Sequence, residues 1–368
     1  MTDRRPERIE RLLTRIADEG LDALVVSHPA NVRYLTGFSG SAGLLLVCRQ
    51  GLLFLTDSRY ETQSRVEIGD LARIVIEGAG MWERLVALVA EYPLVRSLGF
   101  EAHAVTVREA DRLAREAAAR QGAAWRVQPT TDLVEGLRTV KSPEEVDAIR
   151  AAGAVATGAL EDAVACVRAG QTEFEVAALL EGALRRHGSE DYPFPSIVAS
   201  GPRAALPHAG TSSRQLERGD FLLLDFGAVV DGYASDVTRT FVVGAPPTDR
   251  QDEVYGVVRH AQQAALDGLH AGLTGKEADA LAREVIGAAG HGPAFGHSLG
   301  HGVGLEVHEA PRLARTATDV LPECAVVTVE PGIYYSDWGG VRIEDDVVLG
   351  ATGASLLTQF PRDLLVIG

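Results

Sequence analysis

The sequence is poor in cysteine and has no long apolar run. Three cysteines occur in 368 residues, at positions 48, 166 and 324, and so few, odd and scattered a set indicates neither a disulfide framework nor a zinc ribbon. No stretch approaches the ~18 consecutive apolar residues of a membrane span. The charged start, MTDRRPERIERLL, lacks the apolar region of a secretory signal. We therefore expect a cytoplasmic protein with no membrane partner.

The sequence also lacks the positive charge that nucleic acids and anionic membranes attract. Its formal net charge is −16 at pH 7, from 35 Lys and Arg against 51 Asp and Glu. An acidic chain repels both partners, so we expect no nucleic acid to bind. We attribute the excess of acidic residues to solubility. A group of carboxylates that binds cations stays an open alternative.

The length and the order of apolar segments predict two domains. In the first 132 residues, the runs DALVVS, GLLLVC, GLLFLT, RIVIEG and SLGFEA predict strands, and stretches of helical period lie between them. This pattern predicts an α/β domain with mixed strands over residues 1–132. The second domain, 133–368, is expected to open with a helix that ends near residue 168, because Ser142 and Glu145 match a capping box with Pro143 at the first helical position.

The second domain carries a faint internal repeat. AGQTEFEVAALLEGALRRHG and AGLTGKEADALAREVIGAAGHG share Ala-Gly-x-Thr-x-x-Glu, an amphipathic helix and a His-Gly end. Thr172 with Glu175 and Thr274 with Glu277 repeat one capping box. Coincidence of a common cap is the alternative, but a long helix precedes each copy. Duplication predicts a pseudo-symmetric domain with a site between its halves.

Two aspartates share one face of a predicted hairpin. The turn centres on Asp231-Gly232 in GDFLLLDFGAVVDGYASDVTRTF, so Asp225 faces Thr238, and Asp236 projects from the same face. Two charges so close in apolar strands repel each other, and a bound cation removes the repulsion. The alternative is one protonated or solvated aspartate.

A second carboxylate pair follows in TVEPGIYY and GGVRIEDD. Glu330 ends one predicted strand, and Glu344 lies on the same face of another strand as Arg342. We expect all four carboxylates on strands of one sheet, where two divalent cations would balance them. The neighbours Asp345 and Asp346 are expected to be structural or solvated, with Asp345 on the opposite face.

The stretch FGHSLGHGVGLEVHEAP sets three histidines, His297, His301 and His308, among glycines. A phosphate-binding loop would need a Lys-Ser or Lys-Thr ending, which is absent, and an HExxH zinc motif fails because Ser298 stands where glutamate is required. The glycines therefore indicate that the backbone passes close to the group that the histidines bind. One imidazole would favour a transition metal over magnesium or calcium, whereas His291, with no motif around it, is expected to be structural.

Five motifs, LLLDFGA, SDVTRTF, HSLGHGVGLEVHE, TVEPGIY and GVRIEDD, occur in this order between about residues 208 and 347. In this order they closely resemble the Xaa-Pro peptidases, the prolidases and aminopeptidase P, which are metallopeptidases of the pita-bread fold. Upstream, RYLTGFSGSAG and LTDSRY resemble their creatinase-type N-terminal domain. The resemblance implies an α/β (α+β) chain with a creatinase-like N-terminal domain followed by a pseudo-symmetric pita-bread domain.

The resemblance also implies site residues. Two divalent ions, Mn²⁺ foremost with Co²⁺ and Zn²⁺ as alternatives, would be held by Asp225, Asp236, His301, Glu330 and Glu344, with Asp236 and Glu344 bridging. The implied catalytic set is His208, His297, His308, Glu330 and Arg342. His208 and His308 would also face the substrate, and Arg312 would hold the free carboxylate of proline.

The implied reaction is hydrolysis of the bond before proline by water activated between the cations, with Glu330 moving the proton. Arg312 favours dipeptides, because a paired carboxylate excludes longer chains; removal of the N-terminal residue from longer Xaa-Pro peptides is the alternative. A non-catalytic pita-bread binding protein, a metal-free creatinase-like hydrolase and a methionine aminopeptidase fit less well. The expected partners are a proline-containing di- or oligopeptide and a second copy of the chain in a homodimer.

Overall fold

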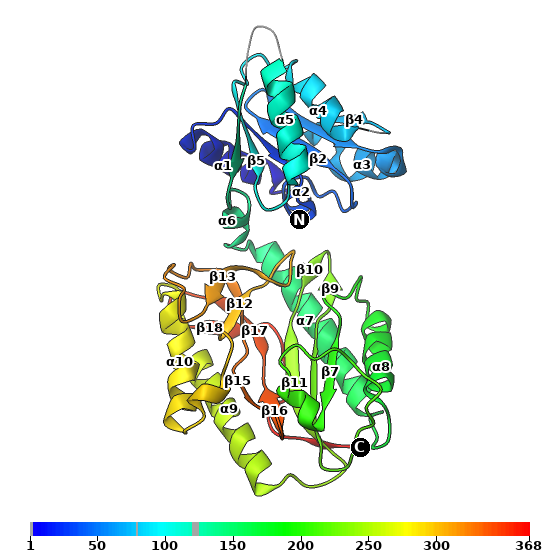
Figure 1. Cartoon of the computed structure of the whole chain (residues 1–368), viewed down its shortest axis with the longest axis vertical. Helices are drawn as coiled ribbons and strands as arrows, with labels where there is room; N and C mark the ends of the chain where they lie inside the picture. The colour runs from blue at the N-terminus through cyan, green and yellow to red at the C-terminus, as the bar shows by residue number, and fades with distance from the viewer. Residues whose placement is uncertain (1–2, 79, 120–124) are drawn as a thin grey trace. The chain divides into compact units, whose positions relative to one another are not determined.

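The computed structural model describes residues 3–78, 80–119 and 125–368, and it divides into two compact units, Met1–Arg138 and Thr139–Gly368 (Figure 1). The boundary expected at 132/133 falls just before helix α6 (Glu135–Arg138). The segment from this expected boundary to the end of α6 belongs to the first unit. Arg15 of α1 (Arg5–Asp18) holds its start by donating to the carbonyls of Asp132 and Leu133, at 3.2 and 2.7 Å.

The first unit is built on a six-stranded mixed sheet of order β4-β3-β2-β1-β5-β6. Its strands are β1 (Ala23–Val26), β2 (Leu44–Cys48), β3 (Gly51–Thr56), β4 (Arg73–Ile76), β5 (Ser97–Glu101) and β6 (Arg126–Thr130). The β1–β2–β3 ladder is antiparallel and the other pairings are parallel. The helices are α1, α2 (Pro29–Thr36), α3 (Glu61–Ile68), α4 (Met81–Val89), α5 (Val107–Ala119) and α6.

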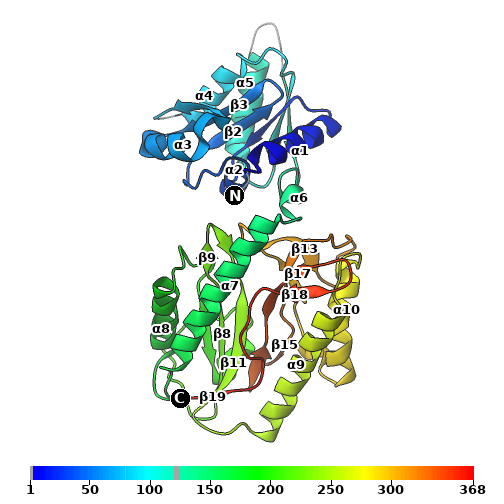
Figure 2. The same ribbon diagram turned by 180° about the vertical axis from the view of Figure 1, so that it is seen from behind.

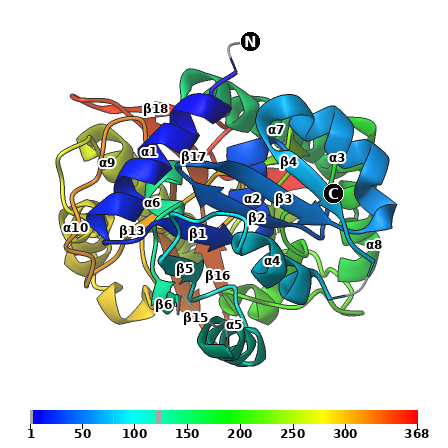
Figure 3. The ribbon, with the colours of Figure 1, turned by 90° about the horizontal axis from the view of Figure 1, so that it is seen from above.

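Helices cover both faces of this sheet, with α1 and α5 on opposite sides of β1 to β3 (Figure 3). Alternate residues of β1, Ala23 and Val25, share a buried cluster with Leu85 and Val89 of α4 and Leu113 of α5. Because successive strand side chains point to opposite faces, Leu24 serves the other side. The sheet is thus the core of the first unit.

The second unit sets two helix pairs beside a set of sheets. The helices are α7 (Pro143–Val164), α8 (Glu173–Arg186), α9 (Asp249–Gly268) and α10 (Gly275–Ala288). One sheet has the order β19 (Val366–Ile367), β11 (Val237–Val243), β8 (Phe221–Phe226), β7 (Ile197–Ser200). Another has the order β13 (Glu309–Leu313), β12 (Gly300–Gly302), β14 (Val326–Val329), β17 (Asp345–Leu349), β18 (Ala354–Leu356). Two short hairpins pair β9 (Val229–Val230) with β10 (Tyr233–Ala234) and β15 (Gly332–Tyr335) with β16 (Gly339–Arg342).

The two halves of this unit repeat the same local structure. Thr172 and Thr274 each cap a 14-residue helix with the predicted capping box. Each threonine also forms an isolated antiparallel bridge to a later segment, Thr172 with Gln215 and Thr274 with Val320. In Figure 2, α7 and α8 flank the strands on one side and α9 and α10 on the other. These matching contacts support internal duplication; the helix before the first copy ends at Val164, slightly before its expected end.

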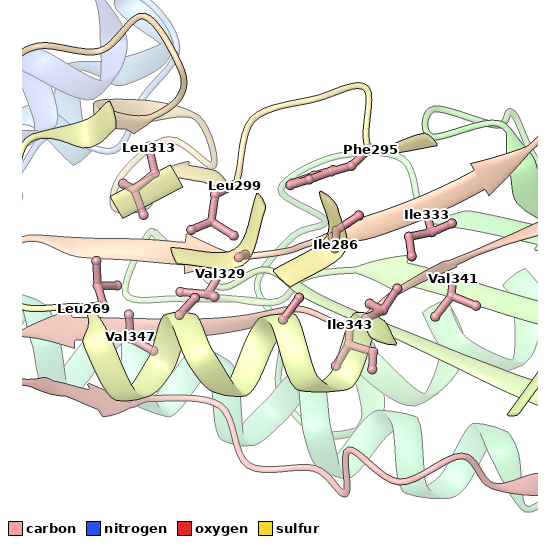
Figure 4. Packing of buried hydrophobic residues seen from close by; sticks show 14 of the residues in the cluster. Leu269, Ile286, Phe295, Leu299, Leu313, Val329, Ile333, Val341, Ile343 and Val347 are labelled. Atoms are coloured by element: carbon pink, nitrogen blue, oxygen red, sulfur yellow. The ribbon is translucent and has the colours of Figure 1, made fainter. Parts of the chain in front are cut away.

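Each half has its own apolar core. One cluster joins α9 and α10 to β14, β15, β16 and β17, and the sticks of Figure 4 show Val329, Val341, Ile343 and Val347 gathered against helix α9. The other joins α7 and α8 to β8 and β11. Among the described residues, no helix combines the length and the apolar character needed to cross a bilayer.

Candidate metal centre

The predicted hairpin places Asp225 and Asp236 together. Asp225 of β8 pairs with Thr238 of β11, as the turn position predicted. The turn residues Asp231 and Gly232 have φ of 51° and 77°, the left-handed values that a two-residue hairpin turn requires. Both site aspartates are buried, with 8% and 5% of their surfaces exposed.

The other two carboxylates come from the second half of the unit, and they do not share a sheet with the aspartates. Glu330 follows β14, and Glu344 lies between β16 and β17. The expectation of a single sheet is wrong, because Pro331 offers no N–H to continue the β14 ladder and the chain turns into the separate β15–β16 hairpin. An isolated antiparallel bridge links the backbones of the two halves at this point, where the Glu344 N–H donates to the Thr238 carbonyl at 3.1 Å.

His301 reaches this region because glycines flank it. A Cβ on Gly300 would lie 2.0 Å from the Thr328 carbonyl oxygen, and one on Gly302 would lie 2.2 Å from that of Ala310. No side chain larger than hydrogen fits between these strands. The glycines therefore serve a close approach of backbone to backbone.

Three of the expected ligands converge directly. Ligand atoms of Asp236, His301 and Glu344 all lie within 4.8 Å of one another. His301 Nε2 is 3.7 Å from Asp236 Oδ2 and 3.5 Å from Glu330 Oε1. Asp225 instead makes an ion pair with Arg342. The buried Asp236 Oδ1 has no hydrogen-bond partner, and a carboxylate oxygen in that state fits a cation ligand.

Burial of so many acids shifts their pKa values upward. Burial, followed by the charges of neighbouring carboxylates, raises the pKa of Asp236 and of Glu344 well above the usual range. Burial raises the pKa of Glu330 to about 8. Burial also lowers the pKa of His301 to about 4, so the imidazole is neutral at pH 7. Neutral imidazole and carboxylate oxygens suit a divalent transition metal, whose charge would replace the protons on the acids.

Arg342 lies at the centre of a buried network. It donates from Nε to Thr238 Oγ1 at 3.0 Å and from Nη1 to the Tyr334 hydroxyl at 2.8 Å. Thr238 Oγ1 in turn donates to Glu344 Oε2, and the Tyr334 hydroxyl lies 2.9 Å from His297 Nε2. The network joins Asp225 and Glu344 through one guanidinium. Tyr334, whose pKa burial raises to about 12, is the last residue of the motif TVEPGIY, but the motif alone indicated no role for it.

A second network holds the histidine loop. Arg283 of α10 donates to the carbonyls of Phe295 and His297, at 3.0 and 2.7 Å. Its partner Asp279 accepts from the Leu299 N–H at 3.0 Å. This pair was also missed; its sequence signal was an acid and an arginine spaced i, i+4 on one helix face.

The expected substrate-facing residues lie on the exposed side of the group. His208, His308 and Arg312 are exposed, and the rings of His301 and His308 are 4.3 Å apart. Arg312 pairs directly with His301 across the β12–β13 ladder, so both side chains project from the same face. Burial lowers the pKa of His308. The charge of Asp225 acts in the opposite direction, and His208 lowers the pKa further.

Three further polar residues, expected to be structural or solvated, make contacts within the protein. Asp345 is buried and pairs with Arg239 at 2.7 Å, and Asp346 Oδ2 accepts from the Asp236 N–H at 2.9 Å. His291 Nδ1 lies 2.7 Å from the Tyr335 hydroxyl.

Comparison with known proteins identifies the family of both parts of the chain. Residues 147–351 match the model of metallopeptidase family M24, and residues 8–140 match the creatinase/prolidase N-terminal domain. The chain is 35% identical to a Xaa-Pro dipeptidase of Pyrococcus furiosus over 367 residues, covering 98% of this chain and 99% of that protein. A Xaa-Pro dipeptidase from Bacillus anthracis superposes with a TM-score of 0.93 at 39% identity, covering 99% and 100% of the two chains. An X-Pro aminopeptidase from Thermotoga maritima superposes with a TM-score of 0.90 at 38% identity, covering 98% and 99%. The predicted order of a creatinase-type domain and a pita-bread domain is thereby confirmed.

Proposed function

The chain belongs to metallopeptidase family M24, and we propose that it is a Xaa-Pro dipeptidase. The observation that carries the proposal is the buried group of Asp236, His301 and Glu344, whose ligand atoms lie within 4.8 Å of one another. This group lies in a chain that resembles proteins named Xaa-Pro dipeptidase over nearly its whole length.

The cofactor of this family is a divalent metal, and we propose two ions, with Mn²⁺ as the native metal. Asp225, Asp236, His301, Glu330 and Glu344 would hold them. When bound, the ions supply a water nucleophile at neutral pH and polarise the scissile carbonyl. Asp225 would leave its pair with Arg342, or share it, to take up this role.

The chain's own residues then manage protons and orientation. Glu330 lies 3.5 Å from His301 Nε2 and would carry the proton from the nucleophile to the proline nitrogen. His308 would donate to the oxygen that becomes charged, a contact that can be worth ~3 kcal/mol when removed. His297 would line the pocket, and His208 would face the substrate. Arg342 is only 3% exposed, so we assign it a positioning role toward Asp225 and Glu344.

Arg312 supports the choice of a dipeptide substrate. It is exposed, and it shares a face with His301, so it can pair with the free carboxylate of proline and exclude a continuing chain. Aminopeptidase activity on longer Xaa-Pro peptides is the second candidate, which the similarity to the Thermotoga maritima X-Pro aminopeptidase favours.

Location and assembly belong to the same proposal. All three cysteines are free thiols, which supports a cytoplasmic location, because thiols stay reduced there. The homodimer stays a prediction, and light scattering of the purified protein tests it.

The test is product analysis with manganese-loaded protein on Gly-Pro, Gly-Pro-Gly and Met-Gly-Gly. We expect rapid cleavage of Gly-Pro, slow release of glycine from Gly-Pro-Gly and no cleavage of Met-Gly-Gly. Preference for Gly-Pro-Gly would establish the aminopeptidase instead. Failure to cleave either proline peptide with Mn²⁺, Co²⁺ or Zn²⁺ bound would overturn the proposal.

A further inference from the structure

A second group of metal-ligating side chains lies wholly within the first unit. His28 follows β1, His103 follows β5, and Glu135 belongs to α6, the first helix after β6. Strands β1, β5 and β6 are neighbours and run parallel, so the segments that leave their carboxyl ends meet at one edge of the sheet. This is the edge at which open α/β sheets bind ligands.

The spacing of the three side chains matches a metal site. Their ligand atoms lie within 4.8 Å of one another, and His103 Nε2 is 3.3 Å from Glu135 Oε1. In a tetrahedral zinc site with ligand distances of about 2.0–2.1 Å, ligand atoms are separated by roughly 3.4 Å. One pair already has this separation. The rings of His28 and His103 are 4.9 Å apart and inclined by 61°, so the third ligand lies beside this pair.

Buried neighbours orient these ligands. Asn31 donates from Nδ2 to Glu135 Oε1 and, at 2.7 Å, to Glu101 Oε1, and Arg138 Nη1 donates to Asn31 Oδ1 at 2.8 Å. Glu101 Oε2 accepts from the backbone N–H of His28 at 2.8 Å. The hydrogen bond from Asn31 to Glu135 is of the kind that fixes the orientation of a metal ligand and raises affinity.

The charges of this region also favour a cation. Glu101 is 3% exposed, and burial raises its pKa, with a further contribution from the charge of Glu135. A divalent ion on Glu135 would offset the repulsion between the two carboxylates. The side chain of His103 is 44% exposed, which leaves a route for the ion and a position for water.

We propose that His28, His103 and Glu135 bind one divalent transition-metal ion, with Zn²⁺ the best match to two imidazoles and one carboxylate. The ion ties the segments that follow β1, β5 and β6, and so stabilises the first unit. The site is independent of the proposed peptidase function. An ordinary ion pair between His103 and Glu135 explains the 3.3 Å distance equally well, but it predicts no metal.

The test counts bound Zn²⁺ in the full chain. Protein stripped with a chelator is dialysed against a slight excess of Zn²⁺ and analysed by inductively coupled plasma mass spectrometry, for the wild type and for H28A, H103A and E135Q. We expect each variant to hold one equivalent fewer than the wild type. We also expect Zn²⁺ to raise the melting temperature of the wild type more than that of H103A.

The matched control is H187A, because His187 Nε2 lies 3.0 Å from Asp162 in a half-exposed pair to which the described residues add no third ligand. It should hold as much zinc as the wild type. H103A is the decisive variant because its side chain is exposed, and its unchanged circular dichroism would confirm folding. Equal zinc content in the wild type, H103A and H28A would overturn the proposal, whatever the peptidase assay shows.

Discussion

Arg342 forms a buried ion pair with Asp225: 3% of the arginine side chain and 11% of the aspartate side chain are exposed. Removing one partner of such a pair leaves an uncompensated charge and typically costs about 3–5 kcal/mol. We expect R342M to lower the free energy of unfolding by that amount. We also expect weaker metal binding, because Asp225 loses its donor and Thr238, which donates to Glu344, loses the guanidinium that holds it. Urea denaturation and metal titration measure both effects.

Arg259 provides the control for that variant. It pairs with Asp363 at the surface, where the two side chains are 53% and 72% exposed. Exposed pairs contribute about 0–1 kcal/mol, so R259M should unfold almost as the wild type does. Similar losses in the two variants would contradict the positioning role of Arg342.

Thr238 tests whether the hydrogen bonds behind a ligand tune the metal site. T238V removes the donor to Glu344 Oε2 and the acceptor for Arg342 Nε with little change in volume. Loss of such a contact typically lowers metal affinity about 10–100-fold, and we expect this for Mn²⁺ measured by calorimetry. T240V is the control: Thr240 is equally buried and bonds to the backbone of Arg342 but touches no expected ligand. An equal loss in both variants would indicate general destabilisation.

The parts of this centre that sequence could predict depend on local signals. An Asp-Gly pair favours one two-residue turn that suits the twist of the strands. Counting residues outward from Asp231-Gly232 therefore predicted the pairing of Asp225 with Thr238. The repeated capping boxes at Thr172 and Thr274 are likewise set within four residues. The geometry of such features is determined by residues that lie close together in the sequence.

The parts that sequence could not predict depend on packing between distant segments. Tyr334 joins His297 to Arg342 only because the β15–β16 hairpin folds against the histidine loop. The expectation of one sheet failed because the strand ladder of β14 ends at Pro331, and the pattern of carboxylates gave no sign of this end. His28 and His103 are 75 residues apart in the sequence (103 − 28), and no motif surrounds either.

Removal of metal should make stability depend on pH. In the metal-free protein, burial raises the pKa of Glu330 from 4.5 to about 8. Between these values the folded state binds more protons than the unfolded state, so the free energy of unfolding falls as pH rises. We expect the urea midpoint of chelated protein to decrease from pH 5 to pH 8. Added Mn²⁺ should reverse this trend and release protons, which a pH-stat records.

E330Q separates this contribution from the other titrating groups. The amide cannot ionise, so the slope of the urea midpoint against pH should be shallower in metal-free E330Q than in the metal-free wild type. A metal-free wild type that grows more stable from pH 5 to pH 8 would contradict the assignment of a buried, protonated Glu330.

Arg312 decides between a dipeptidase and an aminopeptidase. A hydrogen bond to a charged group contributes about 1.5–3 kcal/mol, so R312A should lower kcat/KM for Gly-Pro by roughly 10–150-fold. The loss should fall mainly on KM, because proline's carboxylate is bound equally before and during the reaction. Gly-Pro-amide, which has no carboxylate, should be cleaved equally by both proteins, and R315A, at a nearby exposed arginine, should behave as the wild type. A loss of the same size on Gly-Pro-amide would show that Arg312 supports the fold of β13 and does not read the end of the substrate.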